Sequence, residues 1–275
     1  MISRNEKERL EDIFTHEGFD EINVQKLQRI SGLLNIPLRK VQWFLLEQGI
    51  VPARYQYNIG CFGIDGQMKL IDSAVMIVGL GGLGGYVLEN LARAGIGKMV
   101  GVDPDVFEES NLNRQLLADS ESIGIKKIEH AKQRVGKVNP AVEFVGYASP
   151  FDKLEDEVFG EANLVFDCLD NVPDRRHLAK KCSLANVVLV HGAVAGWCGQ
   201  VGVIRPAEKL FEKIYKNQTM GVEQDIGNLP FTVAVTASLM ASEGIKVLLG
   251  KNRDKKQKVV FFDSLQQDWQ TVYFE

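Results

Sequence analysis

The chain has 275 residues, 45% of them hydrophobic and 25% charged, which is enough for one substantial core and a small additional unit. A formal net charge of −4 at pH 7 and a pI near 5.7 supply no general attraction to phosphate backbones or anionic membranes, which argues against nucleic acid as a partner. The charged start MISRNEKERLED is no secretory signal and no apolar run approaches the roughly 18–20 residues of a membrane span, so we expect a cytoplasmic location and no membrane partner.

The first 50 residues or so have the pattern of amphipathic helices. Apolar residues recur at helical spacing from Val24 to Leu34, and Pro37 begins a second stretch of the same kind. We interpret residues 1–53 as a helical N-terminal arm that packs on its own domain or on a partner subunit. A helix-turn-helix that binds DNA is the alternative, which the surrounding acidic residues disfavour. We expect the apolar stripe of residues 24–45 to be exposed in one subunit and to favour a homodimer.

A change of pattern at Ser73 marks the start of an alternating α/β unit. AVMIVG (74–79) is a continuous apolar run typical of a parallel strand buried on both faces, and a helix is expected after it, up to Gly95 or Gly97. Further strands are predicted at 98–103, 142–146, 163–168 and 187–192, with helices at about 125–138 and 174–186. This alternation predicts a Rossmann-like α/β fold with a doubly wound, mostly parallel sheet.

The C-terminal part contains predicted strands without long crossovers between them. They lie at 199–204, 258–263 and 270–275, and they indicate an antiparallel C-terminal extension of the sheet. A polar loop at about 206–229 and a helix at about 231–249 separate the first two of these strands. We assign residues 54–275 to one domain.

A glycine-rich turn, GLGGLG, follows the first strand of this domain and opens the helix after it. The glycines that we assign to nucleotide binding let the backbone approach an anion, and the start of the helix offers unpaired N–H donors. These glycines are Gly79, Gly81, Gly82 and Gly84. Asp103 ends the second strand about 20 residues later, where a carboxylate accepts hydrogen bonds from both ribose hydroxyls and repels a 2′-phosphate. The pattern predicts a nucleotide with an unmodified ribose. A tight turn without a ligand, with Asp103 capping the next turn, is the alternative.

The segment SNLNRQ (110–115) separates classes of nucleotide-binding protein. An enzyme that transfers hydride does not need a guanidinium and clustered amides beside the pyrophosphate of its cofactor. An enzyme that binds a triphosphate does need such groups. Arg114 can hold phosphate oxygens with its bidentate fork, beside the amides of Asn111 and Gln115, and Lys127 supplies a second positive charge at the start of a helix. The segment therefore favours a triphosphate. The alternative is that Arg114 and Lys127 belong to a solvated face.

The segment DCLDN (167–171) lies at the carboxyl end of the predicted fourth strand, where ligands bind in open α/β sheets. Asp170 would then lie near the phosphates. Two neighbouring anions are tolerated when a divalent cation lies between them, so we predict that Asp170 is a Mg²⁺ ligand. Asp167 is interpreted as a turn or strand-end residue.

Together, these motifs resemble the ThiF/MoeB/HesA family, bacterial relatives of the ubiquitin-activating enzymes. The resemblance rests on the order and spacing of G-x-G-G-L-G, D-x-D-x-V-x-x-S-N-L-N-R-Q, a lysine thirteen residues after the arginine, and D-C-x-D-N. It runs from about Arg54 to the C-terminus and includes the lead-in Arg54-Tyr55 and the pair Gly66-Gln67. It implies an adenylyltransferase that uses ATP and Mg²⁺.

The resemblance also implies a reaction and roles for individual residues. A carboxylate, usually the C-terminal glycine of a ubiquitin-like sulfur-carrier protein, attacks the α-phosphate of ATP and gives an acyl-adenylate and pyrophosphate. Gly81 and Gly82 would line the phosphates, Asp103 would bind ribose and Asp170 would hold Mg²⁺. The remaining triphosphate contacts would come from Asn111, Arg114, Gln115 and Lys127, and the residues that support catalysis would be Arg114, Lys127 and Asp170. A homodimer is implied as well.

Three features depart from the family's pattern. In the lead-in R-Y-x-R-Q a second arginine reaches the partner subunit's ATP, but here Tyr57 stands at that position, which leaves Arg54 or a basic residue of the arm as a substitute. The paired C-x-x-C motifs that bind zinc are missing, so no zinc is expected. The loop at 206–229 has no cysteine to capture the carrier, and Cys198 is interpreted as a packed thiol, so we expect adenylation without a thioester step.

Two other functions stay open at this point. The glycine turn and Asp103 also fit an NAD-linked oxidoreductase, which the constellation of Arg114, Lys127 and Asp170 opposes. A non-catalytic, nucleotide-sensing adaptor whose N-terminal arm binds DNA or protein is the second alternative. The sequence does not choose among the possible carriers.

Overall fold

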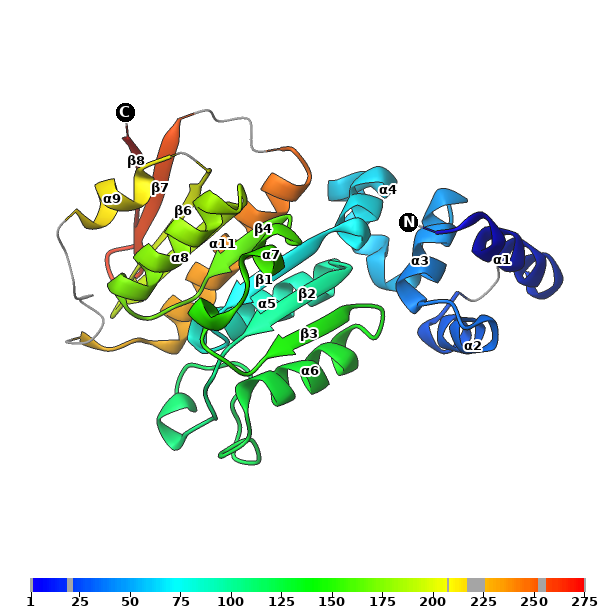
Figure 1. Ribbon diagram of the computed structural model, residues 1–275, viewed down its shortest axis with the longest axis horizontal. Helices are drawn as coiled ribbons and strands as arrows, with labels where there is room; N and C mark the ends of the chain where they lie inside the picture. The colour runs from blue at the N-terminus through cyan, green and yellow to red at the C-terminus, as the bar shows by residue number, and fades with distance from the viewer. Residues whose placement is uncertain (1, 19–21, 207, 217–225, 252–255, 275) are drawn as a thin grey trace.

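The structure is a computed structural model that describes residues 2–18, 22–206, 208–216, 226–251 and 256–274. Its described residues form a sheet of eight strands in the order β3-β2-β1-β4-β5-β6-β7-β8 (Figure 1). The parallel part consists of β1 (Ala74–Val78), β2 (Lys98–Val102), β3 (Glu143–Tyr147), β4 (Leu164–Asp167) and β5 (Val188–Ala195). This order confirms the predicted doubly wound sheet, in which the chain changes direction between β1 and β4.

The other three strands continue the sheet beyond β5 in antiparallel fashion. They are β6 (Cys198–Ile204), β7 (Gln257–Asp263) and β8 (Asp268–Phe274). The predicted antiparallel extension is thereby confirmed. The predicted last strand, 270–275, begins two residues too late, and its final residue lies outside the described residues.

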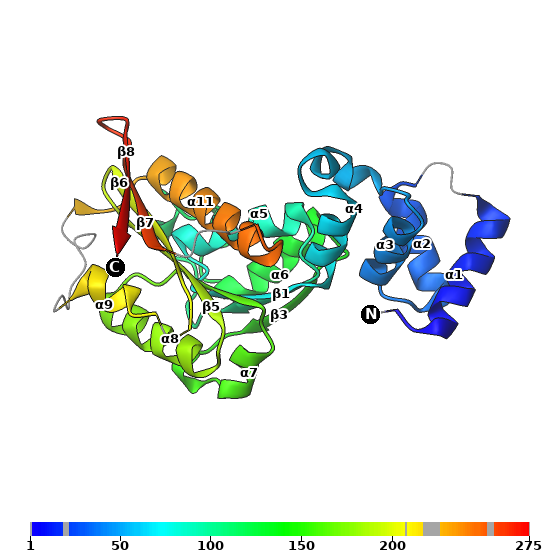
Figure 2. The same ribbon diagram turned by 90° about the horizontal axis from the view of Figure 1, so that it is seen from above.

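Helices cover both faces of the sheet, because strand residues alternate between two apolar layers. In β1, Val75 and Ile77 belong to one core cluster, whereas Met76 and Val78 belong to the other. One face carries α5 (Gly82–Ala94), α6 (Lys127–Val138) and α11 (Pro230–Leu248), and the opposite face carries α7 (Asp156–Gly160), α8 (Val172–Leu184) and α9 (Leu210–Tyr215) (Figure 2). Three single 3₁₀ turns complete the described elements: η1 (Ala53–Tyr55), η2 (Glu109–Asn111) and η3 (Phe151–Lys153).

The helix α11 has the length and the apolar composition of a membrane span, with a mean hydropathy of 1.3. The expectation that no apolar stretch approaches the length of a membrane span is wrong for this helix by length and composition. In the fold it packs against α5, β5 and β6, and Val233, Ala237 and Met240 contribute to the core. Packing accounts for part of its apolar character, since 39% of the apolar window is buried.

The predicted loop at 206–229 contains a helix. Residues 210–215 form α9, whose Leu210, Phe211 and Tyr215 are buried against the sheet. The segment LFEKIY is short and flanked by polar residues, so its apolar positions did not stand out in the sequence. Residues 207 and 217–225 of the predicted loop lie outside the described residues.

The N-terminal arm consists of α1 (Arg4–Glu17), α2 (Val24–Leu34) and α3 (Leu38–Glu47). These helices bury an apolar cluster of their own, in which Leu27, Ile30 and Phe44 are at most 2% exposed. The expectation that the stripe of residues 24–45 is exposed is therefore wrong. It failed because α1, for which no apolar pattern had been identified, supplies Leu10 and Phe14 to cover the stripe.

A helix that the sequence analysis did not predict, α4 (Gln56–Asp72), joins the arm to β1 and bends at Gly63, which has a φ of 71°. Buried polar contacts fasten this junction: the Tyr55 hydroxyl donates to Gln42 Oε1 at 3.0 Å and accepts from Asn139 Nδ2 at 3.2 Å. The arm is thus anchored to the domain that carries the sheet. Tyr57 projects from α4 and is 97% exposed.

Candidate nucleotide-binding site

A cavity of about 490 Å³ opens at the carboxyl ends of β1, β2 and β4, where the sheet changes winding direction. Its volume lies in the usual range for small-molecule sites. Eight of the ten residues predicted to form the site line it: Gly79, Gly81, Gly82, Asp103, Arg114, Gln115, Lys127 and Asp170. The two that do not are Gly84 and Asn111.

The glycine turn is shaped by close backbone contacts. Gly79 has a φ of 90°, and a Cβ there would lie 2.6 Å from the carbonyl oxygen of Cys168. A Cβ on Gly84 would lie 1.8 Å from the carbonyl oxygen of Gly79, so this glycine is needed for close packing of α5 on the turn. The helix α5 begins after Gly81 without a side-chain cap, which leaves the amides of its first turn available to an anion.

Asp103 fixes the turn and faces the cavity. Its Oδ2 accepts the amide of Leu80 at 2.7 Å and its Oδ1 accepts the amide of Asp105 at 2.9 Å. Burial raises the pKa of the Asp103 carboxyl above its ordinary value, and the nearby Lys127 ammonium and the two amides oppose this rise. Each carboxylate oxygen keeps a further lone pair, so Asp103 can still accept hydroxyl hydrogen bonds. The capping role and the ribose-binding role are therefore compatible.

Lys127 is the first residue of α6 and is held between two carboxylates. Its Nζ lies 2.9 Å from Asp105 Oδ2 and 3.9 Å from Asp103 Oδ2, and its side chain is only 8% exposed. The alternative of an Arg and Lys on a solvated face is wrong for this residue. A phosphate that entered the cavity would compete with Asp105 for the ammonium group.

Arg114 and Gln115 line the cavity beside the glycine turn. The guanidinium Nη1 of Arg114 donates to the Ser110 carbonyl at 3.0 Å and to Asn113 Oδ1 at 2.8 Å, which leaves other N–H groups for a ligand. Gln115 is 6% exposed, its Oε1 accepts no hydrogen bond from the described residues, and its amide lies beside Gly81. Gln115 as a residue lines the cavity, and its buried, unpaired Oε1 is an exception to the usual pairing of buried polar atoms.

Asn111 has a local role in this structure. Its Oδ1 accepts the amide of Glu108 at 3.1 Å, and its side chain is 9% exposed. It holds the turn that presents Arg114, whose amide donates to the Asn111 carbonyl at 3.2 Å. Asn111 does not line the cavity, so the structure gives no support to its predicted direct contact with the triphosphate.

Asp170 is exposed at the cavity, and its Oδ1 accepts a 3.4 Å hydrogen bond from Asn171 Nδ2. Asp152 and Asp174 also line the cavity. Hard oxygen donors of this kind suit Mg²⁺, which keeps several waters and needs only one or two protein carboxylates when phosphates supply the rest. Among the described residues no three His, Cys, Asp or Glu side chains come together as a metal site.

Sequence reasoning missed one side of the cavity. Pro150, Phe151 and Lys153 of the η3 segment line it, and Asn228 lines it near the start of α11. The position of η3 directly after β3 was the available signal, because the carboxyl ends of neighbouring parallel strands meet at one edge. The contribution of Asn228 depends on long-range packing.

One sequence interpretation is confirmed and extended, and another needs correction. Asp167 does end β4, and it is also fully buried, with its Oδ2 2.7 Å from Nδ1 of the buried His191. Cys198 is an exposed thiol rather than a packed one. Desolvation raises the pKa of the Cys198 thiol, and the neighbouring Asp263 carboxylate raises it further, which disfavours a reactive thiolate.

The fold and this cavity define a Rossmann-type nucleotide-binding protein, and comparison with known proteins narrows the class. The profile of the ThiF family matches residues 54–275, and the chain belongs to this family. The predicted ThiF/MoeB/HesA resemblance is thereby confirmed.

Three relatives are 31–34% identical to the chain over the aligned residues. It is 34% identical over 228 residues to the molybdopterin-synthase adenylyltransferase of Escherichia coli K12, which covers 80% of this chain and 91% of that protein. It is 33% identical to the SAMP-activating enzyme E1 of Haloferax volcanii over 76% of this chain and 80% of that protein. It is 31% identical to the sulfur carrier protein ThiS adenylyltransferase of Escherichia coli K12 over 76% and 85%.

Solved structures with the same fold are more distant in sequence. The crystal structure of Escherichia coli MccB with ATP superposes with a TM-score of 0.67 over 90% of this chain and 82% of that chain, at 20% identity. PaaA superposes with a TM-score of 0.65 at 16% identity, over 90% of this chain and 83% of that chain. At these identities the likeness concerns the fold, which confirms the predicted Rossmann-like class.

Proposed function

We propose that this protein is an ATP-dependent adenylyltransferase that activates the C-terminal carboxylate of a ubiquitin-like sulfur-carrier protein. The observation that carries the proposal is the cavity itself, where a glycine turn, a buried carboxylate and two cationic side chains meet at the winding switch of the sheet. The relatives support it, because all three are named as adenylyltransferases or as an activating enzyme. None of them is named as an oxidoreductase.

In the reaction, a carboxylate oxygen of the carrier forms a bond to the α-phosphorus of ATP, and the bond from that phosphorus to the bridging oxygen of the β-phosphate breaks. The products are an acyl-adenylate and pyrophosphate. Negative charge develops on the leaving pyrophosphate, so fixed cations beside it lower the barrier without a covalent intermediate on the enzyme. Arg114 and Lys127 supply these cations, and the amides of the Gly81-Gly82 turn hold the phosphates.

We assign the ribose to Asp103 and a Mg²⁺ ion to Asp170. When bound, the ion would neutralise phosphate charge between the nucleotide and the Asp170 carboxylate. Gln115 would meet the nucleotide with its amide nitrogen, which lies beside Gly81. Asn111 and Gly84 support the site indirectly, through the turn before Arg114 and the packing of α5.

The carrier and the assembly complete the proposal. The names of these three relatives refer to molybdopterin synthase, SAMP and the sulfur carrier protein ThiS, and we assign this chain a partner of the sulfur-carrier kind in the cytoplasm. We also propose that residues 54–275 form the catalytic domain and that the protein is a homodimer. The family resemblance alone supports the homodimer, because the apolar stripe of the arm is covered within one chain. Light scattering at micromolar concentration should give twice the mass of one chain.

Carrier-dependent exchange between ATP and pyrophosphate tests the proposal. Purified enzyme with Mg²⁺, ATP, labelled pyrophosphate and a small protein ending in Gly-Gly should form labelled ATP, and a carrier that lacks its last glycine is the control. Equal exchange with and without the intact carrier, or none with any Gly-Gly carrier that a pull-down recovers, would refute the assignment. A nicotinamide difference spectrum in the same preparation would favour the oxidoreductase.

A further inference from the structure

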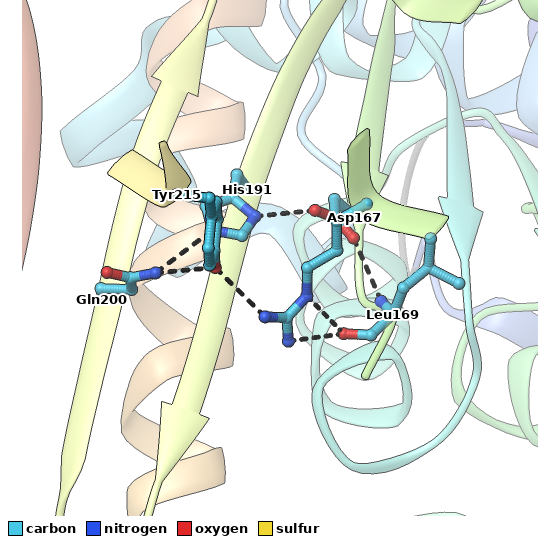
Figure 3. A network of polar contacts seen from close by, with 6 residues as sticks. Asp167, Leu169, His191, Gln200 and Tyr215 are labelled. Atoms are coloured by element: carbon cyan, nitrogen blue, oxygen red, sulfur yellow. Dashed lines mark hydrogen bonds and ion pairs between the residues drawn. The ribbon is translucent and has the colours of Figure 1, made fainter. Parts of the chain in front are cut away.

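A buried chain of hydrogen bonds connects α9 and the sheet to the turn that carries Asp170 (Figure 3). His191 on β5 is fully buried, and its Nδ1 lies 2.7 Å from Asp167 Oδ2 at the end of β4. On the other side of the ring, Nε2 lies 2.9 Å from the hydroxyl of Tyr215, the last residue of α9. The Tyr215 side chain is itself buried, and its ring packs edge-on against His191.

The same network holds the backbone of Leu169, the residue before Asp170. The Leu169 amide donates to Asp167 Oδ1 at 3.2 Å, and the Leu169 carbonyl accepts from Nε and Nη2 of Arg175 at 3.0 and 2.8 Å. The Nη1 of Arg175 donates to the Tyr215 hydroxyl at 3.1 Å. The amide and the carbonyl of Leu169 are therefore held by Asp167 and Arg175. Arg175 bonds directly to Tyr215, and Asp167 is connected to Tyr215 through His191.

The donors and acceptors determine how the protons are arranged. The Tyr215 oxygen accepts from Arg175 and from Gln200 Nε2, the latter at 2.9 Å, and these two donors occupy its lone pairs. A protonated Nε2 on His191 would be a third donor to the same oxygen. The arrangement consistent with these hydrogen bonds has Tyr215 donating to Nε2 and Nδ1–H donating to Asp167.

We propose that His191 and Tyr215 are positioning residues for adenylation, which hold the Leu169-Asp170 turn in place by locking α9 against it. The proposal rests on the proposed function through the role of Asp170. Burying several polar side chains is an expensive way to stabilise a core, since well-packed apolar residues do so at least as well. A fully satisfied polar network instead fixes one geometry, and here that geometry ends at a proposed ligand of Mg²⁺.

The test uses Tyr215→Phe, which removes the shared hydroxyl and keeps the ring that contacts His191 and Phe211. We expect kcat for carrier-dependent exchange to fall about five- to tenfold and the half-saturating Mg²⁺ concentration to rise. The melting temperature should also fall by a few degrees, because the buried donors of Arg175 and Gln200 lose one acceptor. His191→Asn keeps a donor for Asp167 but loses the acceptor for Tyr215, and should reproduce both effects. Tyr273→Phe, on the exposed side of β8, is the matched control and should change neither.

A double-mutant cycle with Asp170→Ala separates positioning from a general structural role. If the network acts through Asp170, Tyr215→Phe should cause no further loss once that carboxylate is gone. Unchanged kcat and Mg²⁺ dependence in both single variants would overturn the inference. A loss of the same size in the Asp170→Ala background would overturn it as well.

A readout without catalysis keeps this inference distinct from the proposed function. Amide hydrogen exchange of the segment 169–171 should be faster in Tyr215→Phe than in the wild type and in Tyr273→Phe. If the wild type adenylates no carrier, the proposed function fails, and the exchange rates alone then decide whether the network orders this turn. Equal exchange rates in all three proteins would refute the network's role.

Discussion

Arg114 and Asp170 both reach the cavity with capacity left for a ligand, although each makes hydrogen bonds within the protein. We expect Arg114→Ala and Asp170→Ala each to reduce adenylation about a hundredfold or more, a loss of about 3 kcal/mol of transition-state stabilisation. Steady-state pyrophosphate exchange measures this directly. Arg4→Ala and Asp268→Ala, at exposed positions outside the cavity, are the controls. Near-normal rates in both site variants would remove the proposed triphosphate site.

Cys198 is exposed to solvent, but its surroundings disfavour the reactive thiolate form. Because desolvation and Asp263 raise the pKa of its thiol, its thiolate fraction near neutral pH is smaller than that of an ordinary cysteine and grows only as the pH rises. Cys198→Ser should leave carrier-dependent exchange within a few-fold of the wild-type rate. A carrier adduct that survives denaturation, is released by a thiol reductant and maps to Cys198 would contradict adenylation without a thioester step.

At the scale of elements, an ion pair joins the first and third helices of the arm. Lys40 Nζ on α3 lies 2.8 and 2.9 Å from the two carboxylate oxygens of Glu6 on α1. The hydrogen bonds from Lys40, and next those from Ser3, lower the pKa of Glu6 to about 2. A lowered carboxyl pKa contributes stability above the ordinary value of 4.5, and this contribution is lost as the pH falls toward 2.

Lys40→Gln should therefore reduce the protection of α1 against hydrogen exchange at pH 6 to 7. The difference from the wild type should shrink as the pH is lowered from 4.5 toward 2. Arg4→Gln removes a more exposed ion pair, with Glu8, and should have a smaller effect. A difference that stays constant over this pH range would show that the pair does not hold α1 in place.

At the scale of the whole molecule, the nucleotide should stabilise the fold. A ligand that binds only the native state raises its melting temperature by mass action, so ATP with Mg²⁺ at a hundred times its Kd should raise it by about 5 °C or more. NAD at equal concentration should have much less effect, because a dinucleotide does not use a triphosphate site. A shift with NAD and none with ATP would reverse the assignment. Differential scanning fluorimetry provides the measurement.

The parts of the chain that were predictable from sequence are those with strong local signals. Apolar runs separated by glycines predicted the strands β1 to β5, the helix after the glycine turn and the antiparallel extension. The shared edge of parallel strands then placed Gly81, Asp103 and Asp170 around one cavity. Such features are encoded within a few residues, or by a rule of topology that holds for every doubly wound sheet.

Other features depended on contacts between distant segments, which no local pattern contains. The helix α1 covers the apolar stripe of the arm, and α9 is buried only because the sheet lies beneath it. Asp167 is the strand end that the sequence indicated, but only the register of β4 and β5 sets it opposite His191, and only the packing of α9 brings Tyr215 to the same ring. The sequence by itself determined the class of fold and the chemistry of the nucleotide site. Only the tertiary structure decided which polar groups are buried together, because a buried hydrogen-bond network is selected by the packing around it.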